Sequence, residues 1–233
     1  MLHSAKLLTL SLLVCIAIVG LPSMAGATTI IALSEDGGLF TTVGSAGSLS
    51  SASGSGTFGD FTFDIAGVAA HNSITLSDLL SSTTSVTNNS GATHTIRVLV
   101  SSQDYTLPLG PSLGIESGMG GSLSTGTLVA SFQSYADKNN NLAGVSDFTL
   151  GLQNSSFNGS TYDTGSATGN FTRLPGNYSL TSIATLTLSG GGVANFSSHE
   201  NVKNVPEPSS LLLIGSSLIL FGGLGLKKNR KNV

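Results

Sequence analysis

Hydrophobic and polar residues alternate over short stretches in the central part of the chain. Between Phe58 and Val68 apolar and polar side chains alternate in part, and a similar alternation recurs between Thr93 and Ser101. A period of two is typical of a strand with one buried face. The apolar positions of the first stretch are Phe61, Phe63 and Ile65, and those of the second are Ile96, Val98 and Val100. No stretch of a dozen residues shows a helical period.

Turn residues separate these runs and predict antiparallel neighbours. Thr28–Leu33 and Leu39–Val43 flank Glu35-Asp36-Gly37-Gly38, which predicts a hairpin. Residues 74–80 fit either a strand or one to two helical turns. Further strands are expected at Gly126–Tyr135, Asp147–Leu152 and Tyr178–Leu188, with a last short run that ends near Phe196.

Three segments lack a clear pattern. Gly44–Gly56 is rich in Ser, Gly and Ala and indicates a loop or a weak strand, and Gly110–Gly121 is similarly loose. Asn195–Asn204 is polar, which favours a flexible tether. Short strands at a spacing of about ten residues predict an all-β antiparallel β-sandwich or jelly roll. A disordered Ser/Gly-rich stalk is the alternative, but the recurring apolar residues are enough to bury a core.

The N-terminal segment has the three parts of a secretory signal. Lys6 precedes an apolar run, Leu7–Leu21, and Ala25 and Ala27 are the small residues that signal peptidase reads. We therefore expect residues 1–27 to be a signal helix that engages the Sec machinery and is cleaved after Ala27. An uncleaved anchor is the alternative, although the run is short for a spanning helix.

Cysteine and charge exclude several classes of function. The single cysteine, Cys15, lies inside this leader and follows Val14, so neither a lipid anchor nor thiol or Cys–metal chemistry is expected in the mature chain. Between Thr28 and Asn204 the net charge is −7, and no basic stripe is present. Nucleic-acid binding is therefore not expected.

The C-terminal 29 residues, Val205–Val233, have three parts in a fixed order. Pro206 and Pro208 hold Glu207 in an extended segment. The apolar stretch 209–226 would span roughly 27 Å as a helix, enough for a thin bilayer core. A cytoplasmic basic cluster should follow, which places the rest of the chain outside. Its residues are Lys227, Lys228, Arg230 and Lys231.

These residues closely resemble the PEP-CTERM sorting signal of Gram-negative bacteria and cyanobacteria. The resemblance covers Val205–Lys231 and departs from the usual pattern only at Asn229 and in the residues after Lys231. It implies recognition of Pro206, Glu207 and Pro208 by exosortase, a membrane cysteine transpeptidase-like enzyme. The chain would then consist of a signal peptide (1–27), a secreted β-sandwich body (28–204) and a sorting signal (205–233). A plain tail anchor is the alternative.

The body shows no motif for enzyme chemistry, a cofactor or a metal. The His-Glu-x-x-His and Gly-x-Ser-x-Gly motifs are absent, and His71, His94 and His199 are isolated in sequence. Asp60 and Asp64 fall on one face of the predicted strand as a potential carboxylate pair, but solvent-facing acids are more common there. We expect no enzyme activity, no cofactor and no metal site.

One polar segment, Asp137–Asn141 with Gly144 and Asp147 beyond it, has two interpretations. Alternate oxygen side chains suit a calcium loop. However, Leu142 stands where a turn glycine belongs, and no glutamate closes the loop. Asn and Asp also form polar turns without any ion.

The resemblance implies export through an inner-membrane intermediate to the cell surface or extracellular matrix. Since similar proteins accompany exopolysaccharide and biofilm matrix, it also implies a structural or adhesive role there. The alternative function is a carbohydrate-binding or carbohydrate-active module. The absence of Trp and the presence of only four Tyr weigh against tight sugar binding.

Overall fold

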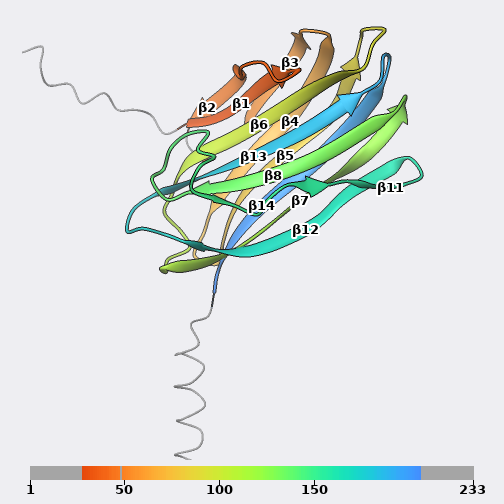
Figure 1. Cartoon of the computed structure of the whole chain (residues 1–233). Helices are drawn as coiled ribbons and strands as arrows, with labels where there is room; N and C mark the ends of the chain where they lie inside the picture. The colour runs from red at the N-terminus through yellow and green to blue at the C-terminus, as the bar shows by residue number, and fades with distance from the viewer. Residues whose placement is uncertain (1–27, 48, 206–233) are drawn as a thin grey trace, which may run out of the picture.

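Two antiparallel sheets face each other in the computed structural model, which describes residues 28–47 and 49–205 (Figure 1). The described ranges contain strands and turns only, so they hold no helix that could cross a membrane. The sequence-based prediction of an all-β antiparallel sandwich is confirmed for the class and for the arrangement in two sheets. The predicted signal helix, the Pro206–Pro208 element, the transmembrane segment and the basic cluster lie outside the described residues.

Sheet A has seven strands. In order across the sheet they are β10 (Gln153–Asn154), β8 (Leu128–Asp137), β13 (Tyr178–Leu188), β6 (His94–Tyr105), β1 (Thr28–Glu35) and β2 (Thr41–Gly47), with β9 (Phe148–Thr149) also paired with β8.

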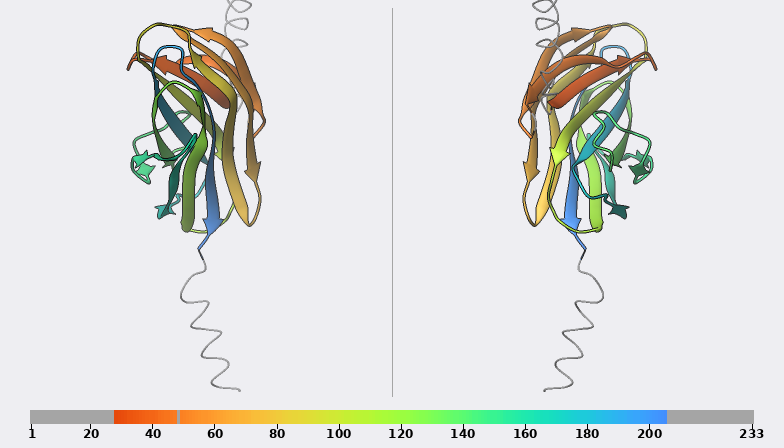
Figure 2. Two further views of the ribbon diagram at one scale, coloured as in Figure 1. Left: turned by 90° about the vertical axis from the view of Figure 1, so that its right-hand side faces the viewer. Right: turned by 90° about the vertical axis from the view of Figure 1, so that its left-hand side faces the viewer.

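Sheet B also has seven strands. Their order is β11 (Ser156–Asn158), β12 (Thr161–Thr172), β7 (Ser112–Thr125), β14 (Val193–Asn204), β5 (Leu76–Asn88), β4 (Phe61–Asn72) and β3 (Ala52–Phe58). Viewed at right angles to Figure 1, the two sheets form two layers (Figure 2).

The core lies between the sheets and consists of the inward-facing side chains of alternating positions. Phe132 and Phe196 are fully or almost fully buried there, and the rings of Tyr105 and Tyr178 stack with their centroids 5.4 Å apart. Buried hydroxyls satisfy one another, as in the 2.7 Å hydrogen bond between Ser117 of β7 and Ser134 of β8, which joins the two sheets. A packed core of this kind can stabilise a chain without disulfides.

Several predicted strands are confirmed. The β1–β2 hairpin turns at Asp36 and Gly37, both of which have positive φ. β13 has the predicted bounds. β5 shows that residues 76–80 belong to a strand and not to a helical turn. The predicted strand 58–68 begins at Phe61 instead, because a tight turn at Gly59 and Asp60 separates β3 from β4.

Two segments without a clear sequence pattern form strands, one of them central and the other at the sheet edges. Gly110–Gly121 was expected to be loose, but most of it belongs to β7, which lies between β12 and β14. A Cβ atom at Gly118 or Gly121 would collide with the neighbouring backbone oxygen of Gly165 or Asn195, so the glycines permit close strand pairing. Much of Gly44–Gly56 likewise belongs to β2 and β3.

The prediction of a tether at Asn195–Asn204 is wrong. This segment belongs to β14, which is hydrogen-bonded to β7 on one side and β5 on the other. Its polar residues alternate with buried ones such as Phe196, Glu200 and Val202. The alternation is not apparent in the sequence, because two of the inward-facing positions hold the polar residues Ser198 and Glu200.

Candidate functional site

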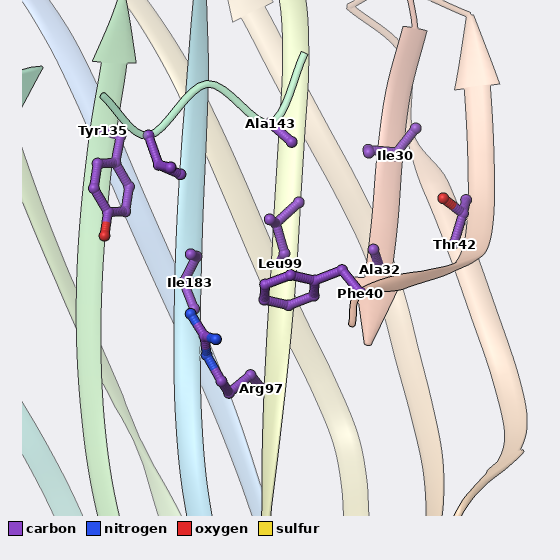
Figure 3. Close-up of a pocket in the computed structure, with 10 residues that line it drawn as sticks. Ile30, Ala32, Phe40, Thr42, Arg97, Leu99, Tyr135, Ala143 and Ile183 are labelled. Carbon is purple, nitrogen blue, oxygen red and sulfur yellow. The ribbon is translucent and has the colours of Figure 1, made fainter. Parts of the chain in front are cut away.

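An apolar hollow of about 360 Å³ lies on the outer face of sheet A (Figure 3). We call it the outer hollow. It is lined by Ile30, Ala32, Phe40, Thr42, Arg97, Leu99, Tyr135, Ala143, Val145 and Ile183.

Strand alternation brings these residues to one face. Arg97 and Leu99 point outward from β6 because Ile96, Val98 and Val100 point into the core, as the sequence pattern predicted. Tyr135 of β8 lies on one side of the hollow and Thr42 of β2 on the other (Figure 3). Leu99 is only 3% exposed although it faces away from the core, because it packs in a small second cluster with Ala32 and Ile183.

Arg97 brings a cation to this apolar surface. Its guanidinium carbon lies 4.8 Å from the centre of the Phe40 ring, within the range of a cation–π contact. Among the described residues, no carboxylate forms an ion pair with Arg97. Its donors therefore remain available to a ligand that enters the hollow.

Tyr135 supplies a hydroxyl group next to this cation. Partial burial raises the pKa of Tyr135 above its usual value, although the nearby Arg97 charge opposes that rise. The phenol therefore stays protonated at neutral pH and can both donate and accept a hydrogen bond.

The 138–147 loop forms part of the wall of the hollow. Asp137 accepts hydrogen bonds from the Asn139 backbone N–H at 2.7 Å and from Asn141 Nδ2 at 2.9 Å. Lys138 Nζ lies 2.6 Å from Asp147 Oδ1. These oxygens are engaged by the chain's own donors, which favours the polar-turn interpretation over a calcium loop. The loop positions Ala143, whose backbone N–H donates to Ser101 Oγ at 2.9 Å.

The potential carboxylate pair of the predicted strand does not form. Asp60 lies in the β3–β4 turn, where its Oδ2 is 3.3 Å from His94 Nε2. Asp64 lies on β4 and accepts a hydrogen bond from Thr84 Oγ1 at 2.9 Å. Asp60 and Asp64 therefore have different partners. Asp60 lies in the turn before β4, so it does not take part in the alternation of side chains along that strand.

A second cavity, of about 480 Å³, lies over β7, β12 and β14 of sheet B. It is lined by polar side chains such as Asn170 and Asn201, and no aromatic ring is among its lining residues. Its cation, Lys203, already lies 3.3 Å from Glu116 Oε2. It offers neither a stacking surface nor a free charge to a ligand.

Sequence reasoning identified none of the residues of the outer hollow as a site. They come from five strands and two loops that are far apart in the chain. The only sequence signal was the outward position of Arg97 and Leu99. The predicted cleavage and sorting residues, Ala25 and Ala27, Pro206–Pro208 and the basic cluster at 227–231, lie outside the described residues.

No protein-family model matches the chain, and no curated protein matches it. Solved structures with some similarity include a carbohydrate-binding module that recognises mannan (14% identity, TM-score 0.28, 66% of this chain and 84% of that one). Another is the adhesin domain of Epf from Streptococcus pyogenes (8% identity, TM-score 0.36, 77% and 60%). A third is the enzymatically active domain of tailspike protein 4 from bacteriophage CBA120 (14% identity, TM-score 0.29, 58% and 18%). The chain thus spans less than a fifth of the tailspike domain and three fifths of the adhesin domain. At these TM-scores the similarities carry no argument about function.

Proposed function

We propose that this protein is an exported carbohydrate-binding module and that the outer hollow binds a polysaccharide. The observation that carries this proposal is the combination of an apolar floor with Phe40, Tyr135 and Arg97, which forms no ion pair with a described carboxylate. This supports the alternative function from the sequence better than a purely structural role, which needs no such hollow.

The chemistry of the hollow suits a sugar ring. One face of a pyranose carries mainly C–H groups, and these can pack against Phe40, Leu99 and Ile183. The ring hydroxyls can accept from the Arg97 guanidinium and exchange hydrogen bonds with the Tyr135 hydroxyl. A few polar groups around an apolar floor are the usual composition of a ligand site.

Binding of a single sugar should be weak. Three of the four tyrosines, Tyr105, Tyr162 and Tyr178, are buried and unable to stack on a ligand. Only Tyr135 and Phe40 present rings at the hollow. Retention on a polymer would then depend on many copies binding one polysaccharide.

On a glycan array, we expect the purified protein to give saturable binding to at least one polysaccharide. Replacing Arg97 or Tyr135 with alanine should weaken this binding at least tenfold, about 1.4 kcal/mol. Both side chains are partly exposed, so the variants should still fold.

Lys203→Ala, on the outer face of sheet B, is the matched control and should bind like the unmodified protein. If no glycan binds saturably, or if all three variants behave alike, the outer hollow is not a sugar site and the structural or adhesive role becomes the better hypothesis.

We further propose that the chain is sorted by exosortase through the inner membrane to the cell surface or matrix. The support is the resemblance of residues 205–231 to the sorting signal together with the N-terminal leader. β14 ends at Asn204, so Pro206, Glu207 and Pro208 follow the last strand almost directly. Exosortase would have to bind these residues close to the end of the sandwich.

Mass spectrometry of the mature C-terminus tests the sorting proposal. The native protein should have lost residues 227–233, and Glu207→Ala should accumulate with this tail intact because the carboxylate between the two prolines is missing. A native protein that keeps Lys227–Val233 would instead be a simple tail-anchored protein.

A further inference from the structure

We propose that Glu35, Asp60 and His94 bind a divalent transition cation, of which Zn²⁺ is the representative. The three residues come from separate segments: the end of β1, the β3–β4 turn and the first position of β6. One ligand atom from each lies within 4.8 Å of the other two. Nitrogen and carboxylate oxygen are common zinc ligands, and three protein ligands leave one coordination position for water.

The orientation of the His94 ring is set by a fourth residue. Its Nδ1 lies 2.7 Å from Asp36 Oδ2, and Asp36 Oδ1 in turn accepts the Thr95 backbone N–H at 2.9 Å. The imidazole therefore donates Nδ1–H to Asp36 and turns Nε2 toward Asp60. Histidine ligands of metals are typically held in this way by a carboxylate on the opposite nitrogen.

The spacing between the His94 and Asp60 ligand atoms suits a tetrahedral ion. His94 Nε2 and Asp60 Oδ2 are 3.3 Å apart. Two ligands at about 2.0 Å from a tetrahedral centre are separated by about 3.3 Å.

Glu35 already lies beside this pair, since its Oε1 accepts the Asp60 backbone N–H at 3.0 Å. Its other oxygen approaches Gly59 so closely that a Cβ atom there would collide with it. Glycine at this turn thus makes room for the third ligand.

The charges around His94 favour a cation. Glu35, Asp36 and Asp60 bring three carboxylates to one imidazole, and within residues 28–47 and 49–205 none of the three forms an ion pair with lysine or arginine. The hydrogen bond to Asp36 raises the pKa of His94, but protonation of the ring offsets only one of these negative charges. A divalent ion would replace that proton and offset two charges. The imidazole ligand favours a transition metal over Ca²⁺ or Mg²⁺.

A cation at this position would join the two sheets. Glu35 and His94 belong to strands of sheet A, whereas Asp60 joins two strands of sheet B. We therefore expect the ion to raise the thermal stability of the folded protein, since it has no comparable site in the unfolded chain.

The chain offers a matched control at His71. Its Nδ1 lies 2.8 Å from Asp78 Oδ1, but among the described residues no second carboxylate forms a contact with its Nε2. Histidine with one carboxylate and no converging ligands should bind zinc far more weakly.

Calorimetric titration of the metal-stripped full chain with ZnCl₂ tests the proposal. We expect one zinc per chain, at least tenfold weaker binding in His94→Gln and in Asp60→Asn, and unchanged binding in His71→Gln. Binding should weaken as the pH falls below the His94 pKa, since protons compete for the ring.

Thermal melts in EDTA establish whether each variant is folded. In the unmodified protein, zinc should shift the NMR signals of the His94 ring and leave those of His71 in place, a readout that needs no variant. Equal zinc affinity in the native protein and His94→Gln, or zinc-induced shifts at His71 alone, would overturn the proposal.

Discussion

Replacing Glu200 with leucine is expected to stabilise the protein at neutral pH by about 1–4 kcal/mol, with a smaller gain as the pH falls toward about 5. Glu200 points from β14 into the core and is fully buried. Neither of its carboxylate oxygens has a hydrogen-bond partner among the described residues. An acidic side chain in this position destabilises the fold whenever the unfolded chain can ionise it.

The sign of the pH dependence follows from the pKa of Glu200. Burial raises this pKa well above the ordinary value, so the folded protein holds a proton that the unfolded chain releases above about pH 4.3. The contribution of Glu200 to the stability of the native protein is therefore highest below that pH. It declines by about 1.4 kcal/mol per pH unit as the pH rises toward the folded-state pKa. Leucine removes this dependence.

Urea unfolding of the native protein, Glu200→Leu and Glu200→Gln between pH 5 and pH 8 would measure the effect. Glutamine keeps the shape of the side chain without the titration, so it separates packing from charge. Parallel pH profiles for all three proteins would show that Glu200 does not change its protonation on folding.

Val202→Asp is expected to destabilise the protein by about 3–5 kcal/mol, a large part of the roughly 5–15 kcal/mol by which a typical domain is stable. Val202 is fully buried on β14, between Ile115 of β7 and Ser77 of β5. Because Val202 is fully buried, a carboxylate in its place would be shielded from solvent. The expected observation, followed by circular dichroism, is a fall in the melting temperature of roughly 6–20 °C.

Asn204→Asp, two residues further along the same strand, is the control. Asn204 is exposed, and the substitution should change the free energy of unfolding by less than about 0.5 kcal/mol. If residues 195–204 were a tether, both variants would melt like the native protein, so equal melts would contradict the assignment of β14 as a central strand.

The sequence was informative where the hydrophobic alternation was strong. β6 and β13 were predicted because their inward positions are Ile, Val and Leu, and the β1–β2 hairpin because Asp36 and Gly37 suit its turn. It was misleading for β7 and β14. Their inward positions include Ser117 and Glu200, and the glycines of β7 are explained by close strand pairing and not by flexibility.

Neither candidate site could be predicted in the same way. Arg97 was recognised as an outward residue of its strand, but Phe40 and Tyr135 approach it only when β2 and β8 take their places in sheet A. His94 has no metal-ligand spacing in sequence. Asp60 reaches it from the β3–β4 turn, 34 positions earlier, and Glu35 from the end of β1, 59 positions earlier.

The sequence by itself determined the all-β class, the antiparallel pairing of neighbouring strands and the −7 charge of the body, because each depends on local pattern or on composition alone. It is also the whole basis for the predicted leader and sorting signal. Only the tertiary structure decided which strands are central, which acid is buried without a partner, and which side chains meet on the outer face and at the end of the sandwich. Those features depend on contacts between segments distant in the chain, and a period of two carries no information about which strands become neighbours.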